Sequence, residues 1–130
     1  MNNHPYTTHL NVAFPSLTRI DVNNDVASVR DQWYNQTLCT VNDSVVRLGV
    51  MLGEYHWHKH DHDDEFFFTL EGRFLIDLEP AAEGVTPGRT IDLLPGQGFV
   101  VPKGVVHRTR APVRSVILMV ENAGIVPTGD

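Results

Sequence analysis

Apolar and polar residues alternate in short stretches over most of this chain, and turn-forming residues separate the stretches. From Trp33 onward the stretches are rich in aromatic and β-branched side chains, which is typical of half-buried strands. The pattern predicts strands over 33–41, 45–52, 55–60, 65–70, 73–78, 90–94, 99–101, 105–109 and 113–120. Glu71-Gly72 predicts a hairpin turn. So many short strands with turn signals between them predict an all-β sandwich or barrel.

Residues 1–32 show no comparable alternation, and prolines and a polar stretch over 21–25 interrupt them. Residues 26–32 predict one or two helical turns, with Asp25 as the cap. We therefore expect an N-terminal extension ahead of the strands. Nothing inside the chain marks a linker, and no repeat is visible, so residues 1–130 are predicted to form a single domain.

Composition and charge exclude several classes of protein. The chain has 130 residues, of which 42% are hydrophobic and 20% charged, and its net charge is −6. A nucleic-acid binder needs basic residues to displace counterions from phosphates, and docking on anionic lipid needs them too. The longest apolar run, Val116 to Val120, is far shorter than the ~20 residues that span a bilayer. The first five residues lack the basic and apolar blocks of a signal peptide, so we expect a cytoplasmic protein. From the charge and the short apolar runs we expect neither nucleic-acid nor membrane partners.

The distribution of histidines indicates a candidate metal site. The chain has seven, and four of them lie close together, at His56, His58, His60 and His62. In a strand, residues i and i+2 project from one face about 7 Å apart, so His58 and His60 can converge on one metal ion. Glu65 follows a four-residue polar loop and can return beside them. The alternative is a solvated histidine-rich hairpin that binds metal only adventitiously.

A fourth ligand would have to come from elsewhere in the chain. His107 is the only histidine outside the cluster and the N-terminal tail, and it follows a Pro-Lys-Gly turn. Cys39 is the only cysteine, so neither an internal disulfide nor a cysteine-rich zinc site can form. Spacing alone does not prove that these side chains converge.

Two stretches of the sequence resemble the two motifs of the cupin superfamily. The first runs from Gly53 through the His58-x-His60 pair and Glu65, with six residues between Glu65 and Gly72. The second has Gly96, five residues, Pro102-Lys103-Gly104, two residues and then His107. Gly53 stands one residue closer to the histidines than in the usual pattern, and Ala111 replaces the asparagine that commonly ends the second motif. The chain is similar to small, single-domain, conserved-barrel cupins.

The resemblance implies a double-stranded β-helix, the cupin jelly-roll barrel, with a core of about 33–121. It also implies that His58, His60, Glu65 and His107 hold a metal inside the barrel. His56 shares a face with the pair and is a candidate for the cavity mouth, whereas His62 is expected in a solvated loop. Phe67 alternates inward with Glu65 and is a candidate pocket wall, with plain core packing as the alternative. Arg47 and Arg73 are interpreted as surface residues.

Three imidazoles and one carboxylate suit one divalent transition metal, namely Fe, Mn, Ni, Co, Cu or Zn. Four protein ligands leave an open position on an octahedral ion for an oxygen ligand or dioxygen. We expect a metal-dependent small-molecule enzyme, with Fe-type dioxygenase or other oxidoreductase chemistry favoured. A non-catalytic module that binds a sugar or another small ligand, and an isomerase or lyase acting on a sugar or organic acid, stay open. Edge strands of such barrels pair between subunits, so we also expect a homodimer.

Overall fold

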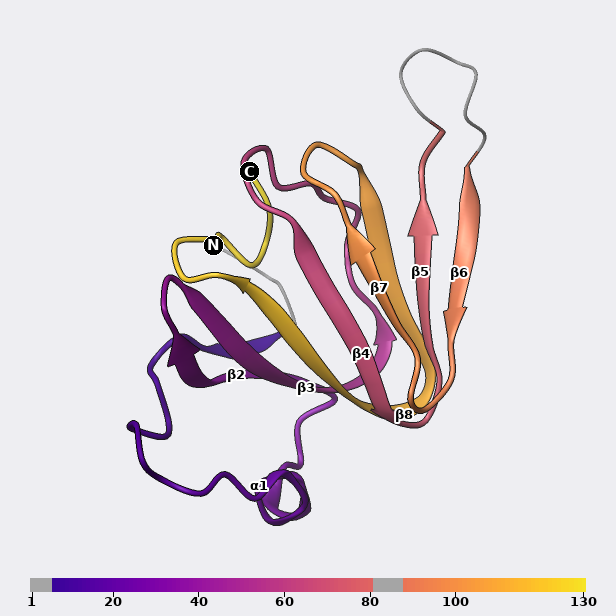
Figure 1. Cartoon of the computed structure of the whole chain (residues 1–130). Helices are drawn as coiled ribbons and strands as arrows, with labels where there is room; N and C mark the ends of the chain where they lie inside the picture. Colours follow the sequence, from indigo (N-terminus) through magenta and orange to yellow (C-terminus); the bar gives the residue numbers. More distant parts are fainter. Residues whose placement is uncertain (1–5, 81–87) are drawn as a thin grey trace.

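The computed structural model describes residues 6–80 and 88–130, and these form a β-barrel with one short helix outside it (Figure 1). The elements are β1 (Thr7–His9), α1 (Val22–Ser28), β2 (Trp33–Val41), β3 (Ser44–Glu54), β4 (Glu65–Glu71), β5 (Phe74–Leu78), β6 (Arg89–Leu93), β7 (Gly98–Val101) and β8 (His107–Asn122). The expectation drawn from residues 1–5 lies outside the described residues. No helix of the described part is long and apolar enough to cross a membrane.

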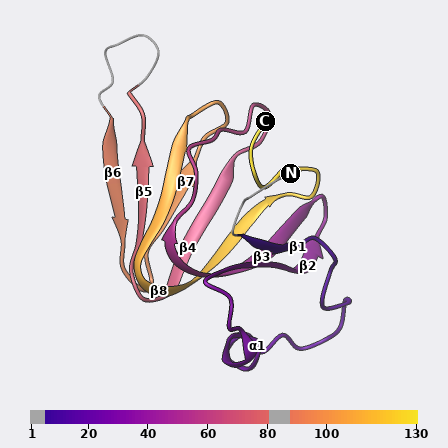
Figure 2. The same ribbon diagram turned by 180° about the vertical axis from the view of Figure 1, so that it is seen from behind.

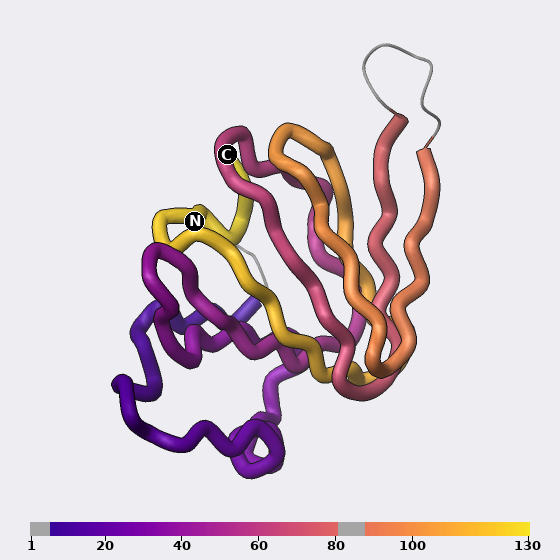
Figure 3. Tube along the Cα trace, viewed as in Figure 1, coloured from indigo at the N-terminus to yellow at the C-terminus, as the bar shows by residue number. Residues whose placement is uncertain are grey.

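The long strand β8 joins the two layers of the barrel. One layer has the strand order β1-β2-β3-β8-β4-β7, and β5 pairs with β6 and β8 in the other. On one edge β8 pairs with β3, at Ser115–Asn122 and again at Arg110 and Ala111. On its other edge β8 pairs with β5 at His107–Arg110 and with β4 at residues 116–121. Pro112 lies between the sections paired with β5 and β4, at the register shift against β3, where its missing N–H costs no ladder hydrogen bond. In Figure 3, viewed as in Figure 1, the orange-to-yellow strand β8 bends sharply at the bottom of the molecule. This bend lets one strand belong to both layers of the jelly-roll barrel.

Side chains of β3 alternate between the barrel interior and an outer cluster. Met51 belongs to the interior core with Trp33, Phe67, Phe74 and Ile117. Leu48 and Val50 belong to an outer core, against which partly buried residues of α1 and of the N-terminal segment pack. Figure 2 shows α1 beside this end of the barrel. The helix begins at Asp21, whose side chain accepts a hydrogen bond from the Asn24 N–H at 3.1 Å.

The predicted all-β barrel is confirmed, and the local predictions need three corrections. The helix spans Val22–Ser28 with Asp21 as its cap, and does not span 26–32 with Asp25 as the cap. Residues 55–60 form no strand, because only the isolated bridge between His58 and His107 pairs them. The two strands predicted over 105–109 and 113–120 are one strand, since β3 pairs with β8 on both sides of Pro112, where the other edge of β8 passes from β5 to β4.

A buried carboxylate fastens β8 to β5 and β6. Asp77 is 7% exposed and accepts hydrogen bonds from Arg110 Nε at 2.8 Å, Arg108 Nη2 at 2.9 Å and Thr90 Oγ1 at 2.7 Å. The hydrogen bond from Arg110 is the largest influence, and together with those from Thr90 and Arg108 it outweighs burial and lowers the pKa of Asp77 to about 2. The carboxylate therefore favours the folded chain at neutral pH.

Asp77→Asn is expected to lower the free energy of unfolding by about 2 kcal/mol at pH 7. Because the pKa of Asp77 is lower in the folded chain, its stabilisation is present above about pH 4 and is lost as the pH falls towards 2. Urea denaturation at pH 7 and pH 2.5 measures this difference. Asp92→Asn is the control, since Asp92 pairs with Arg73 at 43% and 50% exposure and should leave stability unchanged. Equal effects of the two variants would contradict the prediction.

Candidate metal centre

Four side chains from separate parts of the chain meet at one point of the barrel interior. His58 and His60 come from the segment between β3 and β4, Glu65 begins β4, and His107 begins β8. One ligand atom of each residue lies within 4.8 Å of those of the others. His60, Glu65 and His107 are buried, and His58 is half-buried. The structure thus brings together the four side chains that the two sequence motifs single out.

The main chain brings His58 and His107 together without a regular strand at residue 58. The His58 N–H donates to the carbonyl of His107 at 3.0 Å, and the His107 N–H donates back at 2.9 Å. Residues that are directly opposite in an antiparallel bridge project to the same side. Their imidazole centroids are 4.4 Å apart as a result. The Gly104 N–H, in the turn before β8, donates to the His60 carbonyl at 2.8 Å.

Main-chain carbonyls fix how two of the imidazoles are presented. His58 Nδ1 lies 3.0 Å from the His56 carbonyl, and His107 Nδ1 lies 2.9 Å from the Val105 carbonyl. An Nδ1–H that donates to a carbonyl leaves the Nε2 lone pair for a metal, which is how metal-binding histidines are commonly held. His107 Nε2 lies 3.3 Å from Glu65 Oε1. Both of these rings are therefore oriented so that Nε2 is left for a metal.

His60 has two buried ring nitrogens with no hydrogen-bond partner among the described residues. Its Nε2 lies 3.5 Å from Glu65 Oε1, at the edge of hydrogen-bond distance. A buried polar atom without a partner is rare in folded proteins, and a ligand commonly accounts for it. Ligand atoms about 2.1 Å from one ion lie about 3–4 Å from each other, so a modest contraction would close this group around an ion. The residues present therefore fit a metal ion.

The electrostatics of the group favour a divalent cation. Burial, reinforced by the neighbouring His107, lowers the pKa of His58 to about 4, so the neutral ring that binds metals dominates at neutral pH. Burial alone would raise the pKa of Glu65, but its close contacts with His107 and His60 outweigh it and bring this pKa below its usual range. Neutral imidazoles and an ionised carboxylate suit transition metals of borderline softness.

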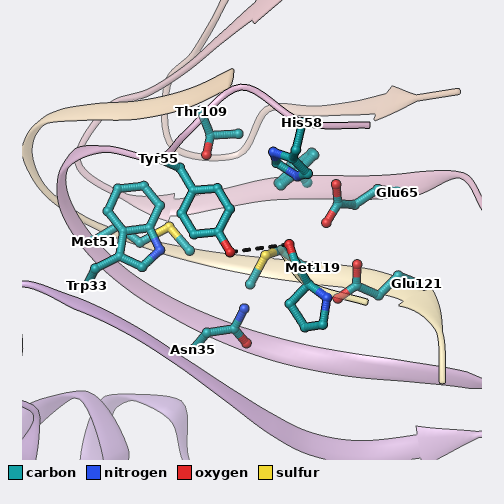
Figure 4. A pocket seen from close by; sticks show the side chains of 11 residues that line it. Trp33, Asn35, Met51, Tyr55, His58, Glu65, Thr109, Met119 and Glu121 are labelled. Atoms are coloured by element: carbon teal, nitrogen blue, oxygen red, sulfur yellow. Dashed lines mark hydrogen bonds between the residues drawn. The ribbon is translucent and has the colours of Figure 1, made fainter. Parts of the chain in front are cut away.

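A small cavity of about 20 Å³ adjoins the group, and His58 and Glu65 form part of its wall (Figure 4). Its other lining residues are Trp33, Asn35, Met51, Tyr55, Phe67, Thr109, Met119, Glu121 and Pro127. Its lining combines apolar side chains with a few polar groups, as in small-molecule sites, but its volume is far below the about 300–1,000 Å³ of such sites. A metal held by the four ligands would be accessible from this cavity through His58 and Glu65.

The remaining candidates from the sequence lie around this centre. Phe67 lines the cavity, and at 3% exposure it is also part of the core. His56 is half-buried beside the cavity wall, where its ring stacks on Tyr55 with centroids 4.5 Å apart. His56 Nε2 lies 2.7 Å from the Thr128 carbonyl. His62 is exposed in the loop before β4.

The C-terminal segment covers one side of the cavity. The hydroxyl of Tyr55 donates to the Pro127 carbonyl at 3.2 Å, drawn as the dashed line in Figure 4. Further along, the Asp130 N–H donates to the Lys59 carbonyl at 2.9 Å. Gly129 packs so closely on His58 that a Cβ there would lie 2.7 Å from the His58 Cβ. The segment therefore contacts a candidate metal ligand as well as the cavity.

Sequence reasoning missed a buried ion pair beside the centre. Arg47, interpreted as a surface residue, is only 2% exposed, and its Nε lies 2.9 Å from Glu121 Oε1. Glu121 is 4% exposed and lines the cavity. The signal was strand alternation, because Glu121 continues the inward series of Ile117 and Met119 at the end of β8. Arg47 likewise shares the inward face of β3 with Met51.

The fold and the site define a class of protein, a jelly-roll barrel with a candidate metal centre beside a small cavity. The family model described as "Cupin_2: Cupin domain" matches residues 46–121. The chain is 43% identical over 94 residues to the uncharacterized protein YdbB of Bacillus subtilis (strain 168), covering 72% of this chain and 77% of that one. This protein belongs to the cupin family.

Solved structures agree with this assignment. A cupin-2 domain containing protein from Shewanella frigidimarina NCIMB 400 has a TM-score of 0.70 and 28% identity, covering 79% of this chain and 93% of that one. A hydroquinone 1,2-dioxygenase from Sphingomonas sp. TTNP3, with 4-hydroxybenzoate bound, has the same TM-score of 0.70. It is 17% identical and covers 84% of this chain but 33% of that one, so it supports the fold alone.

Proposed function

We propose that this cupin is a metal-dependent enzyme that acts on a small molecule. One divalent transition metal, which is Fe, Mn, Ni, Co, Cu or Zn, is held by His58, His60, Glu65 and His107. The observation that carries this proposal is that His58 and Glu65 belong both to the ligand group and to the cavity wall. A purely structural site would be closed off from such a cavity. When bound, the metal supplies a Lewis acid or a redox centre.

The chain's own residues shape the surroundings of that metal. The side chains of Trp33, Met51 and Phe67 exclude water from one side of the cavity. Burial raises the pKa of Tyr55, and its hydroxyl donates to the Pro127 carbonyl. Tyr55 therefore stays protonated at neutral pH and serves to position the C-terminal segment. Main-chain carbonyls orient His58 and His107, and burial keeps the His58 ring neutral at neutral pH.

The reaction that we favour is Fe-type dioxygenase or other oxidoreductase chemistry. The support is the donor set, because three imidazoles and one carboxylate leave open positions on an octahedral ion for a substrate and dioxygen. The assignment of residues 1–130 to one domain, the cytoplasmic location and the homodimer stay predictions.

The test is reconstitution of the metal-free protein with each candidate metal in turn. Oxygen consumption is then followed against a panel of catechols, diketones and thiols, and bound metal is measured by elemental analysis. Turnover that depends on iron supports the proposal. Tight ligand binding without turnover under any metal would favour a binding module, and conversion of sugars or organic acids without oxygen would favour an isomerase or lyase. Failure to bind any of the metals would overturn the site itself.

A further inference from the structure

The cavity beside the candidate metal ligands is closed to anything larger than water. Its volume of about 20 Å³ holds roughly one water molecule, whereas sites for small organic molecules measure about 300–1,000 Å³. An enzyme that acts on a small molecule at this metal has to admit its substrate to the cavity. Part of the cavity wall therefore has to move before a substrate can enter.

Most of the cavity wall is fixed by the barrel, because its residues lie on β2, β3, β4 and β8. Tyr55 and His58 belong to the segment before β4, but their main-chain N–H groups donate to the carbonyls of Thr109 and His107 on β8. Of the lining residues in the described part of the chain, Pro127 alone lies beyond the last strand. The C-terminal segment is thus the part of the wall that can move without breaking the barrel.

The turn that follows β8 sets the point at which this movement would begin. Ile125 is 6% exposed, and its N–H donates to the Asn122 carbonyl at 3.1 Å, so this residue is anchored. Beyond it Val126 is 49% exposed, and residues 126–130, which we call the C-terminal strap, are exposed or half-buried. Lifting the strap would uncover little apolar surface, so hydrogen bonds largely decide its position.

The near end of the C-terminal strap is bonded to the cavity wall. The Tyr55 hydroxyl donates to the Pro127 carbonyl at 3.2 Å (Figure 4), and His56 Nε2 lies 2.7 Å from the Thr128 carbonyl. Tyr55 and Pro127 both line the cavity. The bond between them therefore holds the strap against the opposite part of the wall.

The far end of the strap is bonded to the segment that carries His58 and His60. The Asp130 N–H donates to the Lys59 carbonyl at 2.9 Å, and Asp130 Oδ2 accepts a hydrogen bond from the Asp61 N–H at 2.6 Å. Figure 1 accordingly shows the C-terminus beside the loop that precedes β4. Asp130 does not line the cavity, so its carboxylate can affect the cavity only through the strap or this loop.

A glycine allows the strap to lie close to a candidate metal ligand. Gly129 has a φ of 95°, and a Cβ added there would lie 2.7 Å from the His58 Cβ. A side chain at this position would be strained in its backbone and would also collide with His58. Substitution of Gly129 therefore offers a way to lift the strap that is independent of its hydrogen bonds.

We propose that the C-terminal strap is a lid, which closes the cavity when its hydrogen bonds are made and opens it when residues 126–130 lift away from Tyr55 and Lys59. The role of the lid in admitting a substrate to the metal rests on the proposed function. The opening itself does not, because every bond that holds the strap is made by the chain without a metal.

Trp33 can report whether the cavity is open. It lines the cavity and is 4% exposed, whereas Trp57, the other tryptophan of the chain, is 42% exposed. Trp57→Phe leaves Trp33 as the only tryptophan, and collisional quenching of its fluorescence by acrylamide then measures access to the cavity. The measurement uses the full chain without metal, and fluorescence lifetimes correct for changes in intensity.

In the Trp57→Phe background we expect Asp130→Ala to raise the bimolecular quenching constant about fivefold, since the loss of one hydrogen bond shifts the closed state by about that factor. Gly129→Ala should raise it as well, and Asp130→Asn, which keeps an acceptor, should not. Asp64→Ala is the matched control. Asp64 Oδ1 accepts a hydrogen bond from the Lys103 N–H at 2.9 Å, which is the same kind of bond in the same loop but holds a different turn.

Unchanged quenching in both Asp130→Ala and Gly129→Ala would overturn the proposal, and so would an equal rise in Asp64→Ala. The dissociation constant of Ni²⁺ separates a lid from a mere support of His58. Asp130 supplies no ligand atom, so a lid leaves this constant unchanged in Asp130→Ala. A constant that is weaker by about tenfold or more, the usual cost of losing a residue that orients a ligand, would overturn the lid.

The failure of the proposed function has a different signature. If the chain binds none of the candidate metals, the proposed function fails, whereas quenching of Trp33 in the metal-free chain still decides whether the strap opens.

Discussion

His107→Ala should bind divalent metal roughly a hundredfold or more weakly than the unsubstituted protein. Residues that merely orient a ligand already cost about 10–100-fold when they are removed, and His107 supplies a ligand atom itself. The variant should also lose the thermal stabilisation that saturating metal gives, about 2.7 kcal/mol when the metal is at 100 times its dissociation constant. Elemental analysis, metal titration and melting with and without metal measure both effects.

His56→Ala and His62→Ala are the matched controls. Both lie in the same histidine-rich segment, but neither belongs to the group whose ligand atoms converge. We expect each variant to retain one ion, and His58→Ala to behave like His107→Ala. Loss of metal in His56→Ala or His62→Ala, with His58→Ala unaffected, would shift the ligand set by two residues and refute the assignment.

The strand content of the barrel was predictable because its physical cause is local. A two-residue period of apolar side chains reports which face of a strand is buried, and most of β2 and β4 follows that period, whereas β3 and β5 contain runs of buried residues. β1 was missed because its three residues carry no apolar alternation and depend on pairing with β2. The position of α1 was wrong by four residues, since both Asp21 and Asp25 can cap a helix and packing decided between them.

The candidate ligands were predicted for a reason that is partly wrong. The sequence argument placed His58 and His60 on one face of a strand, but residues 55–60 form none. Their convergence comes from the isolated bridge between His58 and His107, a contact between distant segments that spacing does not reveal. The resemblance to the two cupin motifs nevertheless predicted the ligand set that this long-range pairing brings together.

The buried ion pair of Arg47 and Glu121 was not predictable from composition or motif. Arg47 and Glu121 are residue types that are almost never fully buried unless they are paired, so an isolated sequence favours the surface for both. Their partnership depends on the register of β3 against β8, in which Arg47 faces Met119 and Glu121 faces Val45. Only the assembled barrel shows that the guanidinium and the carboxyl compensate each other.

The other large effect is expected at this buried pair. Burial and the nearby negative charge of Glu65 raise the pKa of Glu121 well above its usual value, and Arg47 opposes that shift. Arg47→Met would leave the carboxyl of Glu121 buried without its cation. Removing one partner of a buried ion pair typically costs about 3–5 kcal/mol, so we expect a loss of that size in the free energy of unfolding. Urea denaturation at pH 7 measures it.

The double variant Arg47→Met with Glu121→Met separates the pair from the packing of the individual side chains. It replaces both charges by apolar groups of similar length, and such replacements of buried pairs are often neutral. We therefore expect the double variant to recover most of the stability that either single change removes. Arg73→Met is the surface control, since its ion pair with Asp92 is exposed. Single changes that simply add, with no recovery in the double variant, would show that the two charges do not depend on each other.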